Sequence, residues 1–136
     1  MAKRLTKSFN EEEFECPCCG KNEIKMELVE LLQQLRDVIK EPIIVTSGYR
    51  CKQYNLNIGG YVHSKHMEGK AADIKVSDMT PKWLAGYGAD MFFKRIGCYP
   101  NHVHVELGDK PLYWVVKKYG DKIKYFNNIH DALDYV

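Results

Sequence analysis

Long hydrophobic runs are absent from this 136-residue sequence, and no stretch approaches the length that a membrane-spanning helix needs. The basic start "MAKR" is followed by the acidic run "EEE" at residues 11–13, where a secretory signal peptide would have an apolar segment. We therefore expect the chain to stay in the cytoplasm as synthesised, unless another factor releases it.

An excess of charge of either sign is also lacking. Lys and Arg number 20 against 18 Asp and Glu, which gives a formal net charge of +2, and no run of like charge has the length of an interaction tail. This balance argues against a nucleic-acid partner. Hydrophobic residues make up 45% and charged residues 28% of the chain, which is typical of one ordinary globular domain.

The cysteines number five, and an odd number excludes a disulfide framework that uses all of them. Cys16 and Cys19 form a C-x-x-C motif, with Cys18 between them. Such a motif could be half of a zinc site or a redox pair. Only Cys51 and Cys98 remain as further cysteine ligands, so a structural metal, a disulfide and ordinary packing all stay open for this group.

Helix and strand patterns are mixed along the chain without a regular strand–helix–strand rhythm. Apolar residues at helical spacing predict a helix over about residues 25–40, and Thr80 before Pro81 predicts a second helix that runs through "WLAGYGADMFFKR" with its aromatic residues in the core. The remaining patterns predict four strands and a short helix, within residues 42–50, 71–77, 97–108, 113–116 and 131–135.

These elements predict an α+β fold, with a small antiparallel sheet flanked by helices. One domain is expected over residues 1–136. Within it, residues 1–8 are expected to be flexible and residues 109–136 to form a C-terminal extension that packs on the domain.

His66 and Asp73 are the first candidates for chemistry. They are seven residues apart, and on one helix this spacing would separate them by about 10 Å along the axis. That is too far for a shared zinc ion, whose bonds to protein ligands are about 2 Å long. A turn at Gly69, between a loop and a strand, would let the two side chains converge.

A second group of candidates follows from strand alternation in "HVHVE". His102, His104 and Glu106 should share one face, with the valines on the other. The nitrogen and oxygen donors of His66, Asp73 and His104 suit zinc and leave a fourth position for water. Such a water can attack a peptide carbonyl that the metal polarises.

Arg50 ends the predicted strand "IIVTSGYR". A guanidinium group can hold a carboxylate by two parallel hydrogen bonds. The terminal carboxylate of a peptide, or a polarised carbonyl, would give Arg50 a partner in a substrate, although a structural ion pair is the alternative.

The order of "TSGYR", "SKHMEGKAADI" and "HVH" resembles the D-Ala-D-Ala carboxypeptidase family of zinc peptidases, in its small phage-endolysin-like branch. The pattern S-x-H-x-x-G-x-A-x-D of that family is matched without a gap from Ser64 to Asp73. The resemblance runs from about Phe9 to Leu107 and includes the cysteine-rich turn. It implies the α+β fold that this family shares with lysostaphin-like peptidases and the hedgehog signalling domain.

The resemblance also implies a peptidase that acts on stem peptides of bacterial peptidoglycan and that is released to the wall during phage lysis. A monomer without a membrane or nucleic-acid partner is expected from the residues themselves, because no heptad or long apolar edge argues for assembly. Its expected site comprises one catalytic zinc ion on His66, Asp73 and His104, with Arg50 and Ser64 as substrate-binding residues and His102 or Glu106 as the catalytic acid–base. Other members of the family place an acid three residues before the last ligand. Here that residue is Asn101, which cannot act as a base.

Two further alternatives remain open. The enzyme could release a terminal residue as a carboxypeptidase or cut within the stem peptide as an endopeptidase. A different class of function, a non-catalytic zinc-containing binding module, is also compatible with this fold and with Asn101 in place of the acid.

Overall fold

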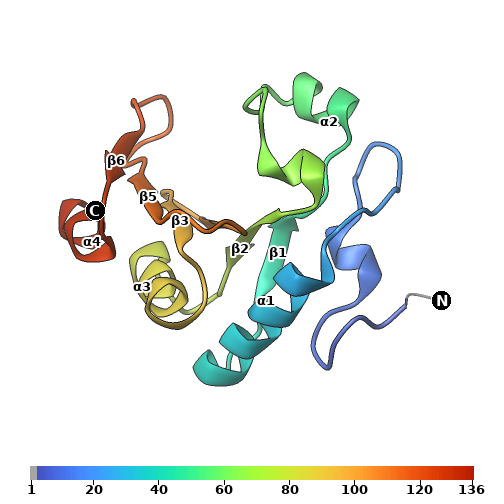
Figure 1. Cartoon of the computed structure of the whole chain (residues 1–136), viewed down its shortest axis with the longest axis horizontal. Helices are drawn as coiled ribbons and strands as arrows, with labels where there is room; N and C mark the ends of the chain where they lie inside the picture. The colour runs from blue at the N-terminus through green and yellow to red at the C-terminus, as the bar shows by residue number, and fades with distance from the viewer. Residues whose placement is uncertain (1–2) are drawn as a thin grey trace.

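A six-stranded sheet with the order β1-β2-β4-β3-β5-β6 forms the centre of the structure, a computed structural model that describes residues 3–136 (Figure 1). The strands are β1 (Ile44–Ser47), β2 (Ala71–Lys75), β3 (Arg95–Cys98), β4 (Val103–Glu106), β5 (Leu112–Val115) and β6 (Lys124–Phe126). Strands β3 and β5 pair in parallel and the other neighbours are antiparallel. The α+β class is confirmed, and the sheet is mixed where an antiparallel one was expected.

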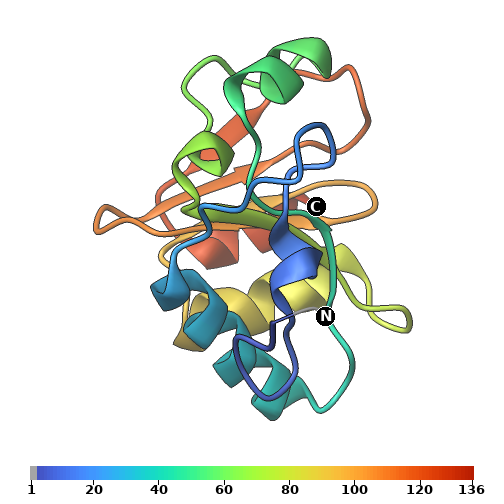
Figure 2. The same ribbon diagram turned by 90° about the vertical axis from the view of Figure 1, so that its right-hand side faces the viewer.

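Four α-helices and two 3₁₀ helices complete the domain. They are η1 (Glu11–Phe14), α1 (Met26–Ile39), α2 (Lys52–Asn57), η2 (Lys65–Glu68), α3 (Pro81–Met91) and α4 (Ile129–Tyr135). Helices α1, α3 and α4 lie on one side of the sheet, and α2 with η2 lies on the other (Figures 1 and 2). None of the helices within residues 3–136 has both the length and the apolar character needed to cross a membrane.

Helix α1 forms where the apolar stripe predicts it. Leu28, Leu32 and Leu35 are fully buried on its inner face. The helix ends at Lys40, which takes a left-handed conformation and donates its N–H to the carbonyl of Arg36. This packing covers the helix side of β2 and β4 with one continuous hydrophobic core.

Alternation along β2 and β4 divides apolar from polar side chains. Ile74, Val103 and Val105 are buried in the core beneath the sheet. Asp73 pairs with His104 across the two strands, and both side chains therefore lie on the opposite face. The predicted chemistry thus lies on the face that α1 and α3 leave uncovered.

The region after α3 differs from the prediction. The helix ends at Met91, and residues 95–98 form β3 where the sequence suggested a longer helix and a turn. Phe93 is buried as expected, but Trp83 and Tyr87 are 65% and 40% exposed. Helical spacing placed these aromatic residues on a common stripe, and the rotation of α3 against the sheet leaves part of that stripe in solvent.

The two ends of the chain join the domain through defined contacts. The N–H of Ser8 donates to Oε1 of Gln33 on α1 at 2.7 Å. Of the N-terminal segment expected to be flexible, residues 1 and 2 lie outside the described part. Strands β5 and β6 extend the sheet, and α4 packs against both of them.

Candidate metal centre

His66, Asp73 and His104 converge on the open face of the sheet. They come from η2, β2 and β4, and one donor atom from each lies within 4.8 Å of the others. Nε2 of His66 is 3.3 Å and Nδ1 of His104 is 3.0 Å from the same oxygen, Oδ1 of Asp73. The three residues that the sequence proposed as ligands therefore form one cluster of two imidazoles and a carboxylate.

The turn before β2 allows His66 and Asp73 to meet. Ser64 caps η2, and its hydroxyl accepts a hydrogen bond from the N–H of His66 at 3.1 Å. Gly69 ends η2 with φ +71°, and a Cβ at that position would lie 1.9 Å from the carbonyl oxygen of Glu23. Glycine is required there for both its conformation and its space. The hydroxyl of Ser64 faces His66, while its expected role in substrate binding stays a prediction.

The second nitrogen of His66 fixes how its ring is protonated. Nδ1 lies 2.7 Å from the carbonyl oxygen of Gly48, and because a carbonyl only accepts, Nδ1 carries the proton. Nε2 then presents a lone pair, yet within residues 3–136 this buried atom has no hydrogen-bond partner. A buried acceptor without a partner is costly, and coordination to a metal ion would satisfy it.

His104 is held between two carboxylates. Its Nδ1 faces Asp73, and its Nε2 lies 2.8 Å from Oε1 of Glu106. The other oxygen of Glu106 accepts from Nε of Arg95 at 2.6 Å. A carboxylate on the outer nitrogen of a histidine is a common device that orients the ring for a metal on the inner nitrogen.

The charges of the cluster depend strongly on one another. Burial alone would lower the pKa of His104, but its hydrogen bonds to Asp73 and Glu106 raise that pKa to about 9. Burial would raise the pKa of Asp73, but its hydrogen bond with His104 and the nearby ring of His66 hold that pKa well below its ordinary value. The pKa of His66 is lowered because the ring is buried. Asp73 is therefore ionised and His66 is neutral, which are the states in which each could bind a metal ion.

Arg50 lies at the edge of the cluster with three protein partners. Its Nη2 is 3.2 Å from Oδ2 of Asp73, and its Nε donates to the hydroxyl of Ser47 at 3.0 Å. Its Nη1 donates to Oδ1 of the buried Asn55 at 3.3 Å. These contacts fix Asp73 so that the opposite oxygen, Oδ1, faces the two histidines.

His102 lies beside the cluster without joining it. Its Nε2 is 3.9 Å from Oδ1 of Asp73, and its Nδ1 is 3.0 Å from Oδ1 of Asn101. The ring stacks on Tyr99 with a centroid distance of 4.5 Å, and Nδ1 also lies 3.2 Å from the hydroxyl of Tyr119. Burial lowers the pKa of His102, so that the ring is neutral near pH 7.

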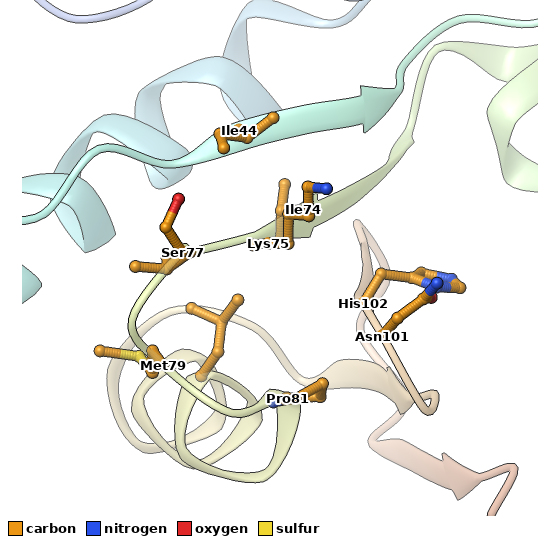
Figure 3. Close-up of a pocket in the computed structure, with 10 residues that line it drawn as sticks. Ile44, Ile74, Lys75, Ser77, Met79, Pro81, Asn101 and His102 are labelled. Carbon is orange, nitrogen blue, oxygen red and sulfur yellow. The ribbon is translucent and has the colours of Figure 1, made fainter.

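A pocket of about 390 Å³ adjoins His102. Asn101 and His102 lie on one side of this pocket, and Ser77 and Met79 lie on the other (Figure 3). His102 thus borders both the cluster of His66, Asp73 and His104 and a hollow of mixed polarity.

Two further residues lie beside the pair of His104 and Glu106, and neither was among the expected site residues. Arg95 reaches Glu106 because these residues are paired across β3 and β4, and β3 itself was not predicted. Trp114 lies 5.3 Å from the ring of His104, and its indole lies over Gly97, where a Cβ would come within 2.3 Å of Nε1. Only the sheet register, which brings Gly97 between His104 and Trp114, reveals these contacts.

Comparison with known proteins agrees with this site. A family model described as Peptidase M15 matches residues 5–106, which include all three candidate ligands and His102. A search of curated proteins found no match.

Proposed function

The chain belongs to the peptidase M15 family, and we propose that it is a zinc-dependent peptidase that hydrolyses stem peptides of bacterial peptidoglycan. Peptidases of this family are zinc-dependent and act on substrates derived from peptidoglycan. The single observation that carries the proposal is the buried Nε2 of His66, which faces Asp73 without a hydrogen-bond partner in the described chain.

The proposed ligands are Nε2 of His66, Oδ1 of Asp73 and Nδ1 of His104. Two imidazole nitrogens and one carboxylate oxygen are a donor set that suits a catalytic zinc site with an open position. When bound, the ion would supply a Lewis acid for the scissile carbonyl and lower the pKa of a water molecule.

His102 is the proposed acid–base residue. Its Nδ1 is engaged by Asn101 and Tyr119, so Nε2 is the nitrogen that can take a proton beside Asp73 and return it to the leaving amine. Glu106, the second candidate, already uses one oxygen on His104 and the other on Arg95. We therefore assign Glu106 to the orientation of His104.

The surroundings of Arg50 support a proposal about which bond is cut. Three of its N–H groups already bind Asp73, Ser47 and Asn55, and its side chain is only 13% exposed. This arrangement does not favour the two parallel hydrogen bonds that a terminal carboxylate would accept. We therefore propose cleavage within the stem peptide, as by an endopeptidase, in preference to release of the terminal residue.

The zinc dependence can be tested on purified peptidoglycan. Activity should vanish with a chelator and return with zinc, and His104→Ala should lose it. The matched control is His130→Ala, at an exposed position on α4, which should keep full activity. Robust hydrolysis by His104→Ala would overturn the proposal, and tight zinc binding without hydrolysis of any wall substrate would favour the non-catalytic binding module.

The position of the cut needs a separate measurement. Mass spectrometry of digested wall fragments distinguishes the two reactions, since an endopeptidase yields split stem peptides or opened cross-links. Free D-Ala as the main product would instead identify a carboxypeptidase and contradict the inference that Arg50 is too occupied to bind a terminal carboxylate.

A further inference from the structure

A second group of metal-binding side chains lies outside the peptidase site. The sulfur atoms of Cys16, Cys19 and Cys51 all lie within 4.8 Å of one another. Cys18 lies one position before Cys19 in the same turn and is exposed. Three of the five cysteines therefore meet at one place, although Cys51 is far from the others in sequence, and Cys18 is the nearest candidate for a fourth ligand.

The backbone around Cys16 forms a closed turn. Its N–H donates to the carbonyl of Lys21 at 2.8 Å, and its own carbonyl accepts from the N–H of Gly20 at 2.8 Å. Gly20 has φ +71°, which favours glycine. This turn brings the sulfur atoms of the C-x-x-C motif to the same side, as a pair of metal ligands requires.

The second half of the group comes from the start of α2. Cys51 is the N-cap of this helix, and its sulfur accepts a hydrogen bond from the N–H of Tyr54 at 3.4 Å. The N–H of Cys51 in turn donates to the sulfur of Cys16 at 3.4 Å. The loop that follows η1 lies beside the start of α2 in both views of the fold (Figures 1 and 2).

Hydrogen bonds from backbone N–H groups stabilise thiolates, which are the form that binds metals. The N–H of Cys51 gives the sulfur of Cys16 a hydrogen bond of this kind. Two sulfur ligands of a tetrahedral zinc ion are about 3.8 Å apart, given zinc–sulfur bonds of about 2.3 Å. The observed cluster is therefore close to the size that zinc requires.

We propose that Cys16, Cys18, Cys19 and Cys51 form a second, structural metal site for zinc or a similar thiophilic divalent ion. A disulfide would join only two of these thiols and leave the others beside it, whereas a four-coordinate ion uses all four. The site would tie the N-terminal turn to α2 directly after Arg50, the residue that contacts Asp73. It is independent of the peptidase reaction.

The test is the metal content of protein prepared under reducing conditions. The wild type should bind two zinc ions per chain, and His104→Ala should keep one. Cys51→Ala and Cys19→Ser should each lose one ion, and Cys19→Ser keeps the test valid if Cys51→Ala does not fold, because Cys19 is exposed. Cys98→Ala, which removes a buried thiol outside the cluster, should keep both ions.

Cobalt substitution shows which ligands hold the ion. A cobalt ion on thiolates absorbs strongly in the near ultraviolet through sulfur-to-metal charge transfer, and this band should persist in His104→Ala and disappear in Cys51→Ala. Three results would each overturn the proposal. They are a wild type without the band, Cys19→Ser and Cys51→Ala variants with unchanged metal content, and a disulfide in the protein prepared under reducing conditions. None of these results depends on peptidase activity, so the two sites can fail separately.

Discussion

The carbonyl oxygen of Gly48 lies 2.7 Å from Nδ1 of His66 and thereby fixes the proton on that nitrogen. The residues are 18 positions apart, and the contact connects the end of β1 to η2. The backbone at Gly48 also passes close to η1, because a Cβ there would lie 2.6 Å from Cα of Phe14. The orientation of one proposed ligand thus depends on how tightly two backbone segments pack.

Gly48→Ala should weaken metal binding. The added methyl group would collide with the backbone of Phe14, and the resulting shift would move the acceptor away from His66. Loss of such a supporting contact typically lowers metal affinity by about 10- to 100-fold. Competition with a chelator of known affinity measures this change.

The matched control is Gly86→Ala in α3. A Cβ at Gly86 would meet only the flexible end of Leu133, at 3.4 Å. Alanine is favoured over glycine inside a helix by about 0.5–1 kcal/mol. This variant should keep its metal affinity and its thermal stability. Equal loss of metal affinity in both variants would contradict the role of Gly48.

Glu106→Gln should lower metal affinity without unfolding the protein. The amide can still accept a hydrogen bond from Nε2 of His104, but it loses the charge that makes Nδ1 a stronger ligand and leaves Arg95 without its carboxylate. We expect a loss of about 10- to 100-fold in zinc affinity.

The control for this experiment is Glu68→Gln, whose carboxylate is exposed and pairs with Lys65 and Lys70. It should bind zinc as the wild type does. If Glu106→Gln kept its zinc but lost all hydrolysis, Glu106 would be the acid–base residue and His102 would not.

Much of the fold follows from local patterns. The stripe of α1, the cap at Thr80 and the alternation of β2 and β4 are encoded in neighbouring residues, and the structure has these elements close to the predicted positions. Strand β3 was missed because its four residues carry no alternation that separates them from the end of α3. The parallel pairing of β3 with β5 depends on tertiary packing that no local pattern reveals.

The candidate site could likewise be predicted only in part from the sequence. The motif around His66 and Asp73 and the spacing of His102 and His104 were visible in the sequence, and the structure brings these residues together. Their supporting partners were not visible, because Arg95 contributes through strand register and Gly48 through a backbone carbonyl. Every residue has a backbone carbonyl group, so the sequence does not reveal which of them accepts a hydrogen bond from a ligand.

His102→Ala should abolish most of the activity while the metal stays bound. Removal of a general acid–base typically lowers kcat by about 10²- to 10⁴-fold. Asn101→Ala should lower kcat less, because Tyr119 still contacts Nδ1 of the ring. Steady-state kinetics and metal analysis of the same preparations test both variants.

The control here is His63→Ala, at an exposed position in the loop before η2. It should retain both kcat and zinc. If His102→Ala lost its zinc, His102 would be a ligand, and the acid–base residue would have to be sought elsewhere.

Cys98 should react with alkylating agents far more slowly than an ordinary thiol, because burial raises its pKa from about 9 to about 11. The thiolate is the form that reacts with these agents. Because of the raised pKa, the thiolate fraction of Cys98 at pH 8 is about 100-fold lower in the folded protein than in the unfolded chain. The folded state holds the proton more tightly, so this contribution to stability is present below pH 9 and is lost as the pH rises towards 11. The alkylation rate of Cys98, followed by mass spectrometry, should therefore keep rising up to about pH 11 in the native protein and level off near pH 9 in denaturant. Equal rates in both states at pH 8 would show that Cys98 is accessible and would disqualify it as the buried control for the cysteine cluster.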